Sequence, residues 1–135
     1  MRSIRIIMIY SLLIFAGCEK RPLDFRNKYI GDYSFTIYSS WFNLATGTGD
    51  TTFTSDGNIS YGSAENTLQI TLYNSCVVEY YVYEDGSISF YQYKGGNSCP
   101  QSGIGEFESA KNIRFYWSRN CHGGGGEYDI TGVKK

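Results

Sequence analysis

The chain has 135 residues, with 12 basic and 13 acidic side chains, one histidine and a formal net charge of −1. This length allows one domain with a real hydrophobic core and leaves no room for two. Acidic residues outnumber basic ones from residue 29 onwards. The composition therefore argues against nucleic acid as a partner, because Lys and Arg at the phosphates supply most of that affinity.

The beginning of the chain has the three parts of an export signal. Arg2 and Arg5 precede an apolar segment over residues 6–16, and small residues lead to Cys18. The segment is shorter than the roughly 20 residues that a membrane-spanning helix needs. We predict that residues 1–17 are a signal peptide that is removed, that residues 18–28 are a tether, and that residues 29–135 form the folded domain.

The motif Phe15-Ala16-Gly17-Cys18 resembles the lipobox of bacterial lipoproteins, in which an aliphatic residue and two small residues precede a lipidated cysteine. The resemblance implies that Cys18 receives lipid, becomes the new N-terminus and anchors the chain, because several acyl chains together hold a protein firmly to a bilayer. A plain secretory signal and an uncleaved anchor are the alternatives. In such lipoproteins an Asp after the cysteine favours the inner membrane, so Glu19 favours the outer membrane.

Past the tether, the composition predicts strands, because it is rich in Tyr, Thr, Ser, Gly and β-branched residues. Alternating runs occur at residues 33–37, 68–72, 113–117 and 128–133, and each places its apolar side chains on one face. No segment of about ten residues has the period of an amphipathic helix. We expect about eight or nine antiparallel strands with short turns, as an up-and-down barrel or a sandwich.

Two Asp-Gly pairs predict hairpins with three-residue loops and a glycine in the left-handed conformation. The first loop would be Ser55-Asp56-Gly57, which pairs Phe53 with Ile59. The second loop would be Glu84-Asp85-Gly86. Because a one-residue slip moves every side chain to the opposite face, the alternation of polar and apolar residues favours these registers.

The second hairpin places four tyrosines on its outward face, together with Glu79. Its register pairs Val82 with Ile88 and Tyr80 with Phe90. A flat tyrosine surface can stack on sugar rings or anchor a protein partner. Tyrosine is also common on half-buried strand faces, and this face could instead pack beneath residues 41–50. The candidate ligand surface consists of Tyr81, Tyr83, Tyr91 and Tyr93.

The three remaining cysteines lie in connections that are two strands apart. In an up-and-down meander, alternate connections share one end of the molecule, so Cys76, Cys99 and Cys121 should gather there. An exported chain can oxidise its thiols, and three thiols allow one disulfide and one odd cysteine. Cys99 with Cys121 is the favoured pair because both lie in long loops, whereas Cys76 starts a strand. Pairing through Cys76 stays open.

No motif predicts catalysis or a metal centre. Zinc held by the cysteines and His122 is disfavoured, because structural zinc sites usually have two cysteines a few residues apart. Glu106 and Glu108 share a strand face, but Phe107 between them should enter the core and leave both carboxylates in water. They lack the cleft that a glycosidase pair requires. We predict no catalytic residues, no metal and no cofactor.

The lipobox, the glycine-punctuated, tyrosine-rich strands and the Gly132-Val133-Lys134-Lys135 ending resemble the small all-β lipoproteins of Bacteroidota-type bacteria. The resemblance implies the location and the fold, a lipid-anchored β domain of the cell envelope. Because the residues offer a candidate tyrosine surface and no catalytic motif, we predict a module that binds a glycan or a protein and is not an enzyme. An envelope inhibitor or adaptor is one alternative, since β-barrel lipoproteins that block lysozyme are similar in size, anchor and disulfide use. Such an inhibitor would present a rigid loop from the cysteine-bearing end.

A lipocalin-like carrier with an internal apolar pocket is the other alternative. Large aromatic side chains distinguish a carrier from a solid-core binder, according to whether they line a cavity or fill the interior. The side chains concerned are Tyr33, Phe35, Phe90, Phe115 and Trp117.

Overall fold

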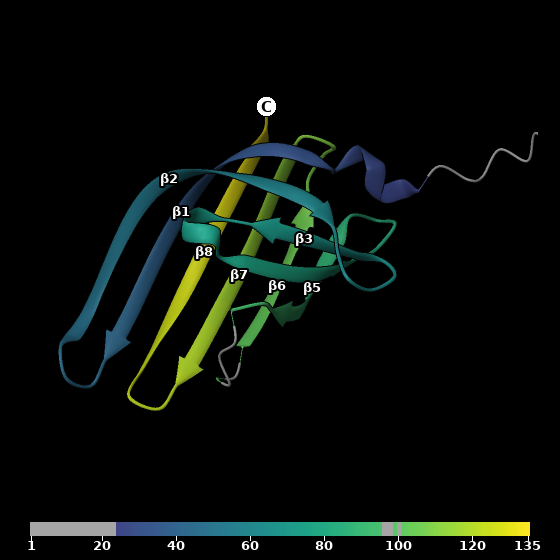
Figure 1. Ribbon diagram of the computed structural model, residues 1–135. Coiled ribbons are helices and arrows are strands. Elements are labelled where there is room, and N and C mark those ends of the chain that lie inside the picture. Colours follow the sequence, from purple (N-terminus) through teal and green to yellow (C-terminus); the bar gives the residue numbers. More distant parts are fainter. Residues whose placement is uncertain (1–23, 96–98, 100) are drawn as a thin grey trace, which may run out of the picture.

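Eight antiparallel strands form a closed barrel in the computed structural model, which describes residues 24–95, 99 and 101–135 (Figure 1). Each strand pairs with the next one along the chain, and the last strand pairs with the first. The predicted all-β meander is confirmed, and it closes as a barrel. The strands are β1 (Gly31–Asn43), β2 (Gly47–Tyr61), β3 (Thr67–Thr71), β4 (Val77–Val82), β5 (Ser87–Tyr93), β6 (Gln101–Phe107), β7 (Asn112–Cys121) and β8 (Gly124–Lys134).

The predicted signal peptide, residues 1–17, lies outside the described residues, as do Cys18 and residues 19–23. All eight strands and the disulfide lie within residues 24–135, so this part of the chain contains the complete barrel. None of the helices described is long and apolar enough to cross a membrane.

The end of the predicted tether packs against the barrel. Residues Phe25–Lys28 form a 3₁₀ turn, η1, whose first N–H groups are capped by Asp24. Arg26 forms an ion pair with Asp24 at 2.5 Å and donates a hydrogen bond to the carbonyl of Thr67 at 3.1 Å. Its guanidinium also lies over the ring of Tyr61. The folded domain therefore begins a few residues before the predicted boundary at residue 29.

Aromatic rings fill the barrel interior. Tyr33, Phe35 and Phe115 are fully buried or nearly so, and they pack ring against ring at 5.7 Å and 6.4 Å. Tyr80 adds a contact of 5.4 Å to Phe115, and Trp117 is also buried. Each such side chain stabilises the fold by roughly 1.5–3 kcal/mol through burial. These aromatic side chains pack against one another in the barrel interior.

The first predicted hairpin is wrong, because residues 55–57 continue a single strand. Asp56 pairs with Ser34 and Gly57 pairs with Tyr33, so β2 runs without a turn along β1. Gly57 lets the backbones of β2 and β3 approach closely, because a Cβ at this position would lie 2.2 Å from the Thr71 carbonyl oxygen. Residues 41–50 likewise belong to the β1–β2 hairpin and do not cover the tyrosine face.

The second predicted hairpin is confirmed at its turn. Gly86 has a φ of +90°, in the left-handed region that favours glycine. Val82 pairs with Ile88, and Tyr80 pairs with Phe90, as the alternation of side chains indicates.

A β-bulge then changes the facing of β5. Glu79 pairs with Gln92 and Val78 pairs with Tyr93, which leaves Tyr91 as the extra residue. An extra residue on one strand exchanges the faces of the residues that follow it. The expectation that Tyr93 faces outward is therefore wrong: Tyr93 points into the barrel.

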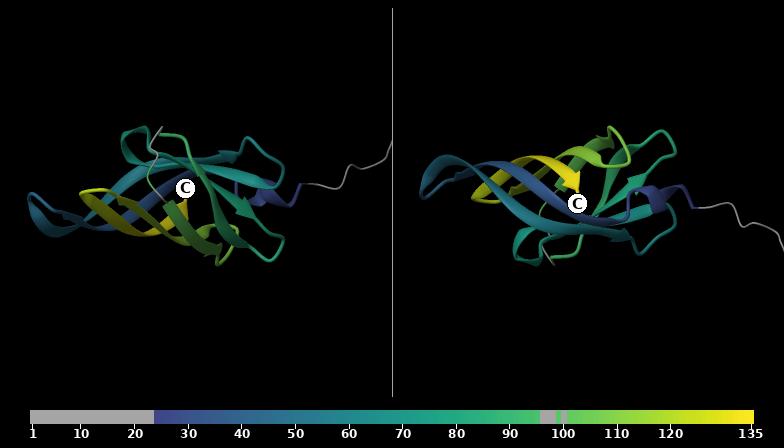
Figure 2. Two further views of the ribbon diagram at one scale, coloured as in Figure 1. Left: turned by 90° about the horizontal axis from the view of Figure 1, so that it is seen from below. Right: turned by 90° about the horizontal axis from the view of Figure 1, so that it is seen from above.

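The barrel has two distinct ends. The end near Asp24 and Lys135 carries η1 and the β4–β5 turn, and we call it the proximal end. At the opposite, distal end the β1–β2 and β7–β8 hairpins project beyond the other strands, as Figures 1 and 2 show. Their tips are joined by a hydrogen bond of 3.0 Å from the Leu44 N–H to the Gly123 carbonyl.

Candidate ligand-binding groove

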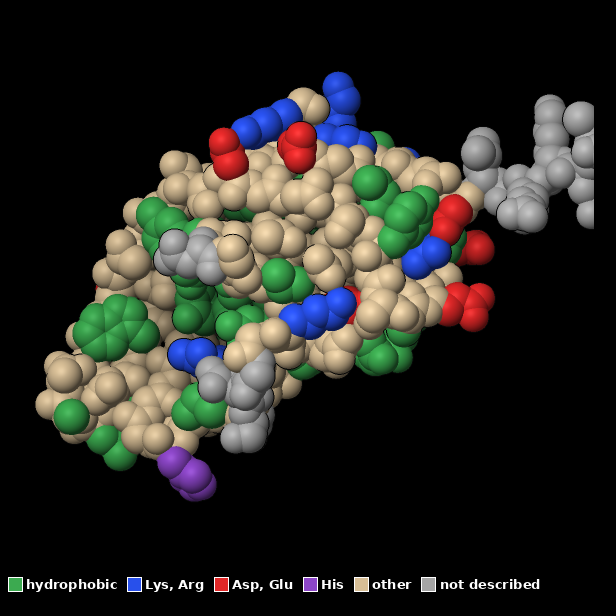
Figure 3. Space-filling view, viewed as in Figure 1, with side chains coloured by type: hydrophobic (Ala, Val, Ile, Leu, Met, Phe, Trp, Pro, Cys, Tyr) green, Lys and Arg blue, Asp and Glu red, His purple; other side chains and the backbone are tan. Residues whose placement is uncertain are grey.

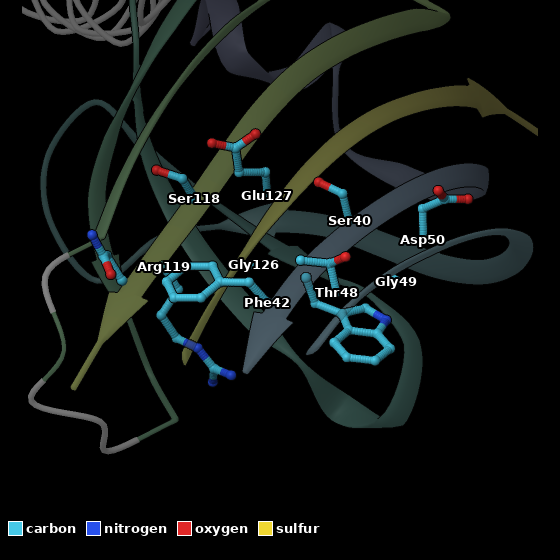
Figure 4. A pocket seen from close by; sticks show the side chains of 11 residues that line it. Ser40, Phe42, Thr48, Gly49, Asp50, Ser118, Arg119, Gly126 and Glu127 are labelled. Carbon is cyan, nitrogen blue, oxygen red and sulfur yellow. The ribbon is translucent and has the colours of Figure 1, made fainter. Parts of the chain in front are cut away.

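A groove of about 550 Å³ crosses the two projecting hairpins at the distal end (Figure 4). Four strands form it in the spatial order β2, β1, β8 and β7. Side chains alternate between the faces of a strand. Those of residues 40, 42, 48, 50, 118, 120 and 127 share the outer face. Trp41 and Arg119 also line the groove, although the alternation of the strands places their side chains on the inner face.

A row of polar side chains runs across all four strands. Ser40 pairs with Asp50 on one side and with Glu127 on the other, and Glu127 pairs with Ser118. Figure 4 shows these four side chains in one line. Ser118 also exchanges a hydrogen bond of 2.8 Å with Ser102 of β6. Asp50 and Glu127 are exposed and form no salt bridge among the described residues.

An aromatic ring borders this row on the side of the hairpin tips. Phe42 pairs with Gly125, and a Cβ on that glycine would lie 2.7 Å from the ring of Phe42. The ring therefore lies across the bare backbone of Gly125, with 44% of the residue exposed. Thr48 and Asn120 complete this edge of the groove.

Two tyrosines lie on the other side of the polar row, two residues along their strands towards the proximal end. Tyr38 and Tyr116 both pair with Asp129, one from each neighbouring strand. Burial raises the pKa of Tyr116, and its hydrogen bond to Glu127 acts in the same direction. Asp129 is engaged by Arg114 at 3.0 Å. The polar row thus lies between aromatic rings, and its two carboxylates form no salt bridge among the described residues.

The predicted tyrosine surface is present in part. Tyr81, Tyr83 and Tyr91 face outward with exposed fractions of 36%, 52% and 36%. The rings of Tyr81 and Tyr91 meet edge to face at 4.7 Å. Tyr93 leaves this surface because of the bulge, and its ring lies 5.5 Å from that of Trp117. Tyr81 and Tyr83 lie beside Phe25 of η1, at the proximal end.

The predicted disulfide is confirmed. Cys99 and Cys121 are joined with an S–S distance of 2.03 Å, and Cys76 is free. Cys76 lies at the same distal end, within the reach of Tyr93 and Arg119. His122 is exposed beside Cys121. Within the part of the chain that the structure describes, no group of His, Cys, Asp or Glu side chains could hold a metal ion.

Glu106 and Glu108 are exposed and flank a buried Phe107, as their spacing predicts. They do not reach the groove. The groove carboxylates Asp50 and Glu127 escaped the sequence analysis because the alternating runs recognised there, 33–37 and 128–133, stop short of the strand ends that form the groove. Tyr38, Ser40 and Phe42 follow one another at the two-residue spacing of one strand face. This spacing could have been used to predict that the first strand continues to the distal end.

The fold and the groove together define a closed β-barrel with a candidate binding site across its projecting hairpins. No protein-family model matches this chain, and no curated protein sequence or solved structure shows significant similarity to it.

Proposed function

We propose that this protein is a lipid-anchored cell-envelope module that binds a neutral glycan, without catalysis, in the distal groove. The observation that carries the proposal is the polar row of Asp50, Ser40, Glu127 and Ser118 between the aromatic rings of Phe42, Tyr38 and Tyr116.

The chemistry of the groove suits a sugar chain. Carboxylates and hydroxyls accept and donate hydrogen bonds to sugar hydroxyls, and an aromatic ring offers a large apolar face to the ring of a sugar. The groove is open and crosses four strands, which suits an extended ligand. Asp50 and Glu127 add two negative charges with no basic partner among the described residues, so an acidic glycan would be repelled.

The groove favours binding over hydrolysis. Asp50 and Glu127 lie on strands either side of β1, about 10 Å apart by the spacing of strands in a sheet. A glycosidase needs one carboxyl group in an apolar pocket that raises its pKa. Both side chains are exposed here. A filled barrel interior likewise supports a surface binder rather than a carrier.

The position of the groove supports an anchor at Cys18. The described chain begins at Asp24, at the end of the barrel opposite the groove. Six extended residues span about 20 Å, so lipid on Cys18 would hold the proximal end near the bilayer and turn the groove away from it. The tyrosine surface at the proximal end would then lie closer to the membrane. We propose the outer membrane as the location.

Binding to arrayed bacterial and host glycans tests the proposal with residues 24–135. We expect retention of neutral glycans by the parent chain and a loss of at least about tenfold in affinity for Phe42→Ala and for Asp50→Asn/Glu127→Gln. The matched control is Tyr81→Ala/Tyr83→Ala/Tyr91→Ala, which should bind like the parent. Loss in this control with retention in the groove variants would move the site to the tyrosine surface.

A protein partner is the second candidate, because three large apolar side chains are exposed at the tip of the β1–β2 hairpin, on both faces of the sheet. Trp41, Phe42 and Leu44 are 41%, 44% and 83% exposed. Large side chains that a partner buries on binding carry much of the energy of protein interfaces. Two results together would favour an inhibitor or adaptor. The well-folded domain would bind no glycan, and it would capture one envelope protein in a way that Leu44→Asp abolishes.

The anchor is tested separately by labelling cells with radioactive palmitate. We expect label in the full chain and none in the Cys18→Ser variant, which should move from the membrane fraction to the soluble periplasm. Equal membrane association of both chains would contradict lipidation.

A further inference from the structure

The inner face of the distal end is an open mouth of the barrel, separate from the outer groove. β2 pairs with β3 only over Asn58–Tyr61, and β5 pairs with β6 only over Ser87–Ser89. The distal parts of these strands therefore do not close the sheet. Figure 3 shows hydrophobic side chains gathered in a recess on this side of the molecule, with a basic side chain at its edge.

Aromatic rings line this mouth. The ring of Trp117 stacks on Tyr128 at 4.7 Å and lies 5.5 Å from Tyr93. Across the mouth, Phe53 and Tyr73 meet edge to face at 4.9 Å. Apart from the buried Trp117, these side chains are half-buried, so they present ring surface and hydroxyl groups at the opening.

Arg119 is the cation in this aromatic surround. Its Nε atom is buried and has no hydrogen-bond partner among the described residues, and its guanidinium forms no ion pair with them. The other arginines described are paired, Arg26 with Asp24 and Arg114 with Asp129. The strand neighbour with a carboxylate, Glu127, points to the outer face.

The surroundings of Arg119 are phenols and a thiol. Burial raises the pKa values of Tyr73, Cys76 and Tyr93, and the nearby charge of Arg119 acts in the opposite direction on all three. Arg119 also lines a cavity of about 370 Å³ with Trp41, Asn43 and Cys121.

Arg119 is half-buried, and its buried Nε donor lacks a partner among the described residues, so a counter-charge that accepts hydrogen bonds from the guanidinium would stabilise it. The planar fork of a guanidinium matches a carboxylate through two parallel hydrogen bonds. A ligand with one negative charge would neutralise the single cation, Arg119. A ligand that contains a ring could also stack on the aromatic side chains of the mouth.

We propose that the distal mouth is a second binding site, which takes a ring-bearing monocarboxylate with its carboxylate on Arg119 and its ring against Tyr128, whose own ring stacks on Trp117. The ligand is a free aromatic acid or an acidic sugar, which share this chemistry. Arg119 also lines the outer groove, but its side chain lies on the inner face, and binding in the mouth does not require a ligand in the groove.

Titration of residues 24–135 with benzoate, glucuronate and the neutral analogue benzamide tests the proposal. The readout is the NMR signal of the two tryptophan indole N–H groups, assigned with Trp41→Phe. We expect saturable shifts of the Trp117 signal with a carboxylate and at least tenfold weaker binding of benzamide, the value of one charge-assisted hydrogen bond. Tighter binding of benzoate identifies an aromatic acid, and tighter binding of glucuronate identifies an acidic sugar.

Variants of Arg119 distinguish a specific loss of carboxylate binding from a general loss of structure. Arg119→Gln should weaken carboxylate binding at least tenfold, and Arg119→Lys should fall between the parent and Arg119→Gln, because Lys keeps the charge without the fork. The control, Arg114→Gln, removes an exposed arginine of the same strand and should bind like the parent. A midpoint of unfolding for Arg119→Gln at or above that of the parent shows that the variant is folded.

Three results would each overturn the proposal. They are the absence of saturable binding by both carboxylates, equal binding of benzoate and benzamide, and parent-like affinity in Arg119→Gln. The neutral glycan test above does not depend on these outcomes.

Discussion

Gln92 donates a hydrogen bond of 2.7 Å from its Nε2 to Oε2 of Glu79, its cross-strand partner next to the β-bulge. Without the extra residue, Gln92 would face the core and Tyr93 would face solvent. The bulge therefore does two things: it supplies a polar partner to a fully buried carboxylate, and it delivers Tyr93 to the aromatic mouth. Ser63 and Thr67 also hydrogen-bond to this carboxylate.

Acid should destabilise the barrel through Glu79. Although burial opposes ionisation, hydrogen bonds from Gln92, Thr67 and Ser63 lower the pKa of Glu79 from 4.5 to about 2. The folded state then holds this proton less tightly than the unfolded chain does, so the stabilisation is complete above about pH 4.5 and is lost as the pH falls towards 2. Urea unfolding across this range should show the decline.

Glu79→Gln should lower the free energy of unfolding by about 2 kcal/mol at neutral pH, because the amide presents a donor to buried donors. The variant should also lose this part of the acid dependence. Glu65→Gln, at an exposed carboxylate, is the control and should behave like the parent. An unchanged acid profile in Glu79→Gln would contradict the assignment.

Reduction should weaken the fold without abolishing it. The Cys99–Cys121 bond joins residues 22 apart, and closing a loop of that size contributes about 3 kcal/mol in the chain-entropy account. Thermal unfolding with and without dithiothreitol measures the effect. A Cys99→Ala/Cys121→Ala variant should match the reduced parent and show no further response to the reductant, whereas a response would implicate Cys76.

Gly57→Ala should destabilise the barrel by about 2 kcal/mol, although β2 has no turn at this position. The new Cβ would lie 2.2 Å from the Thr71 carbonyl oxygen and 2.7 Å from the ring of Phe35, so the backbone must shift. Thr54→Ala, at an exposed position of the same strand, is the control. Denaturant unfolding compares the two, and equal stabilities would show that β2 and β3 separate at little cost.

Cys76 should react slowly with a thiol reagent in the folded protein. Burial raises its pKa, and the hydrogen bond to Tyr93 and the charge of Arg119 offset this only in part. The thiolate is the reactive form. We expect labelling by iodoacetamide to accelerate strongly in denaturant and to slow further in folded Arg119→Gln. Faster labelling in that variant would place the guanidinium away from the sulfur.

The local pattern of the chain was sufficient for much of the fold. Alternation of apolar side chains identified strands around Phe35, Ile70, Phe115 and Ile130, because facing in a strand is a property of neighbouring residues. The turn at residues 84–86 followed from glycine's access to positive φ, and the disulfide followed from the parity of connections in a meander. These features depend on chemistry within a few residues or on simple strand counting.

Tertiary contacts decided the rest. The Asp-Gly pair at residues 56–57 favours a turn locally, yet pairing along the whole of β1 outweighs that preference. The bulge at Tyr91 depends on the pairing of Glu79 with Gln92 and of Val78 with Tyr93. The sequence of β5 alone does not specify these partners on β4. The groove and the mouth lie on opposite faces of a sheet formed by segments far apart in the chain. By itself the sequence determined the strand character of the chain, the centres of several strands and where one disulfide joins them. The three-dimensional pairing decided where β1 and β2 end and which side chains meet, because register is set by the sum of long-range contacts.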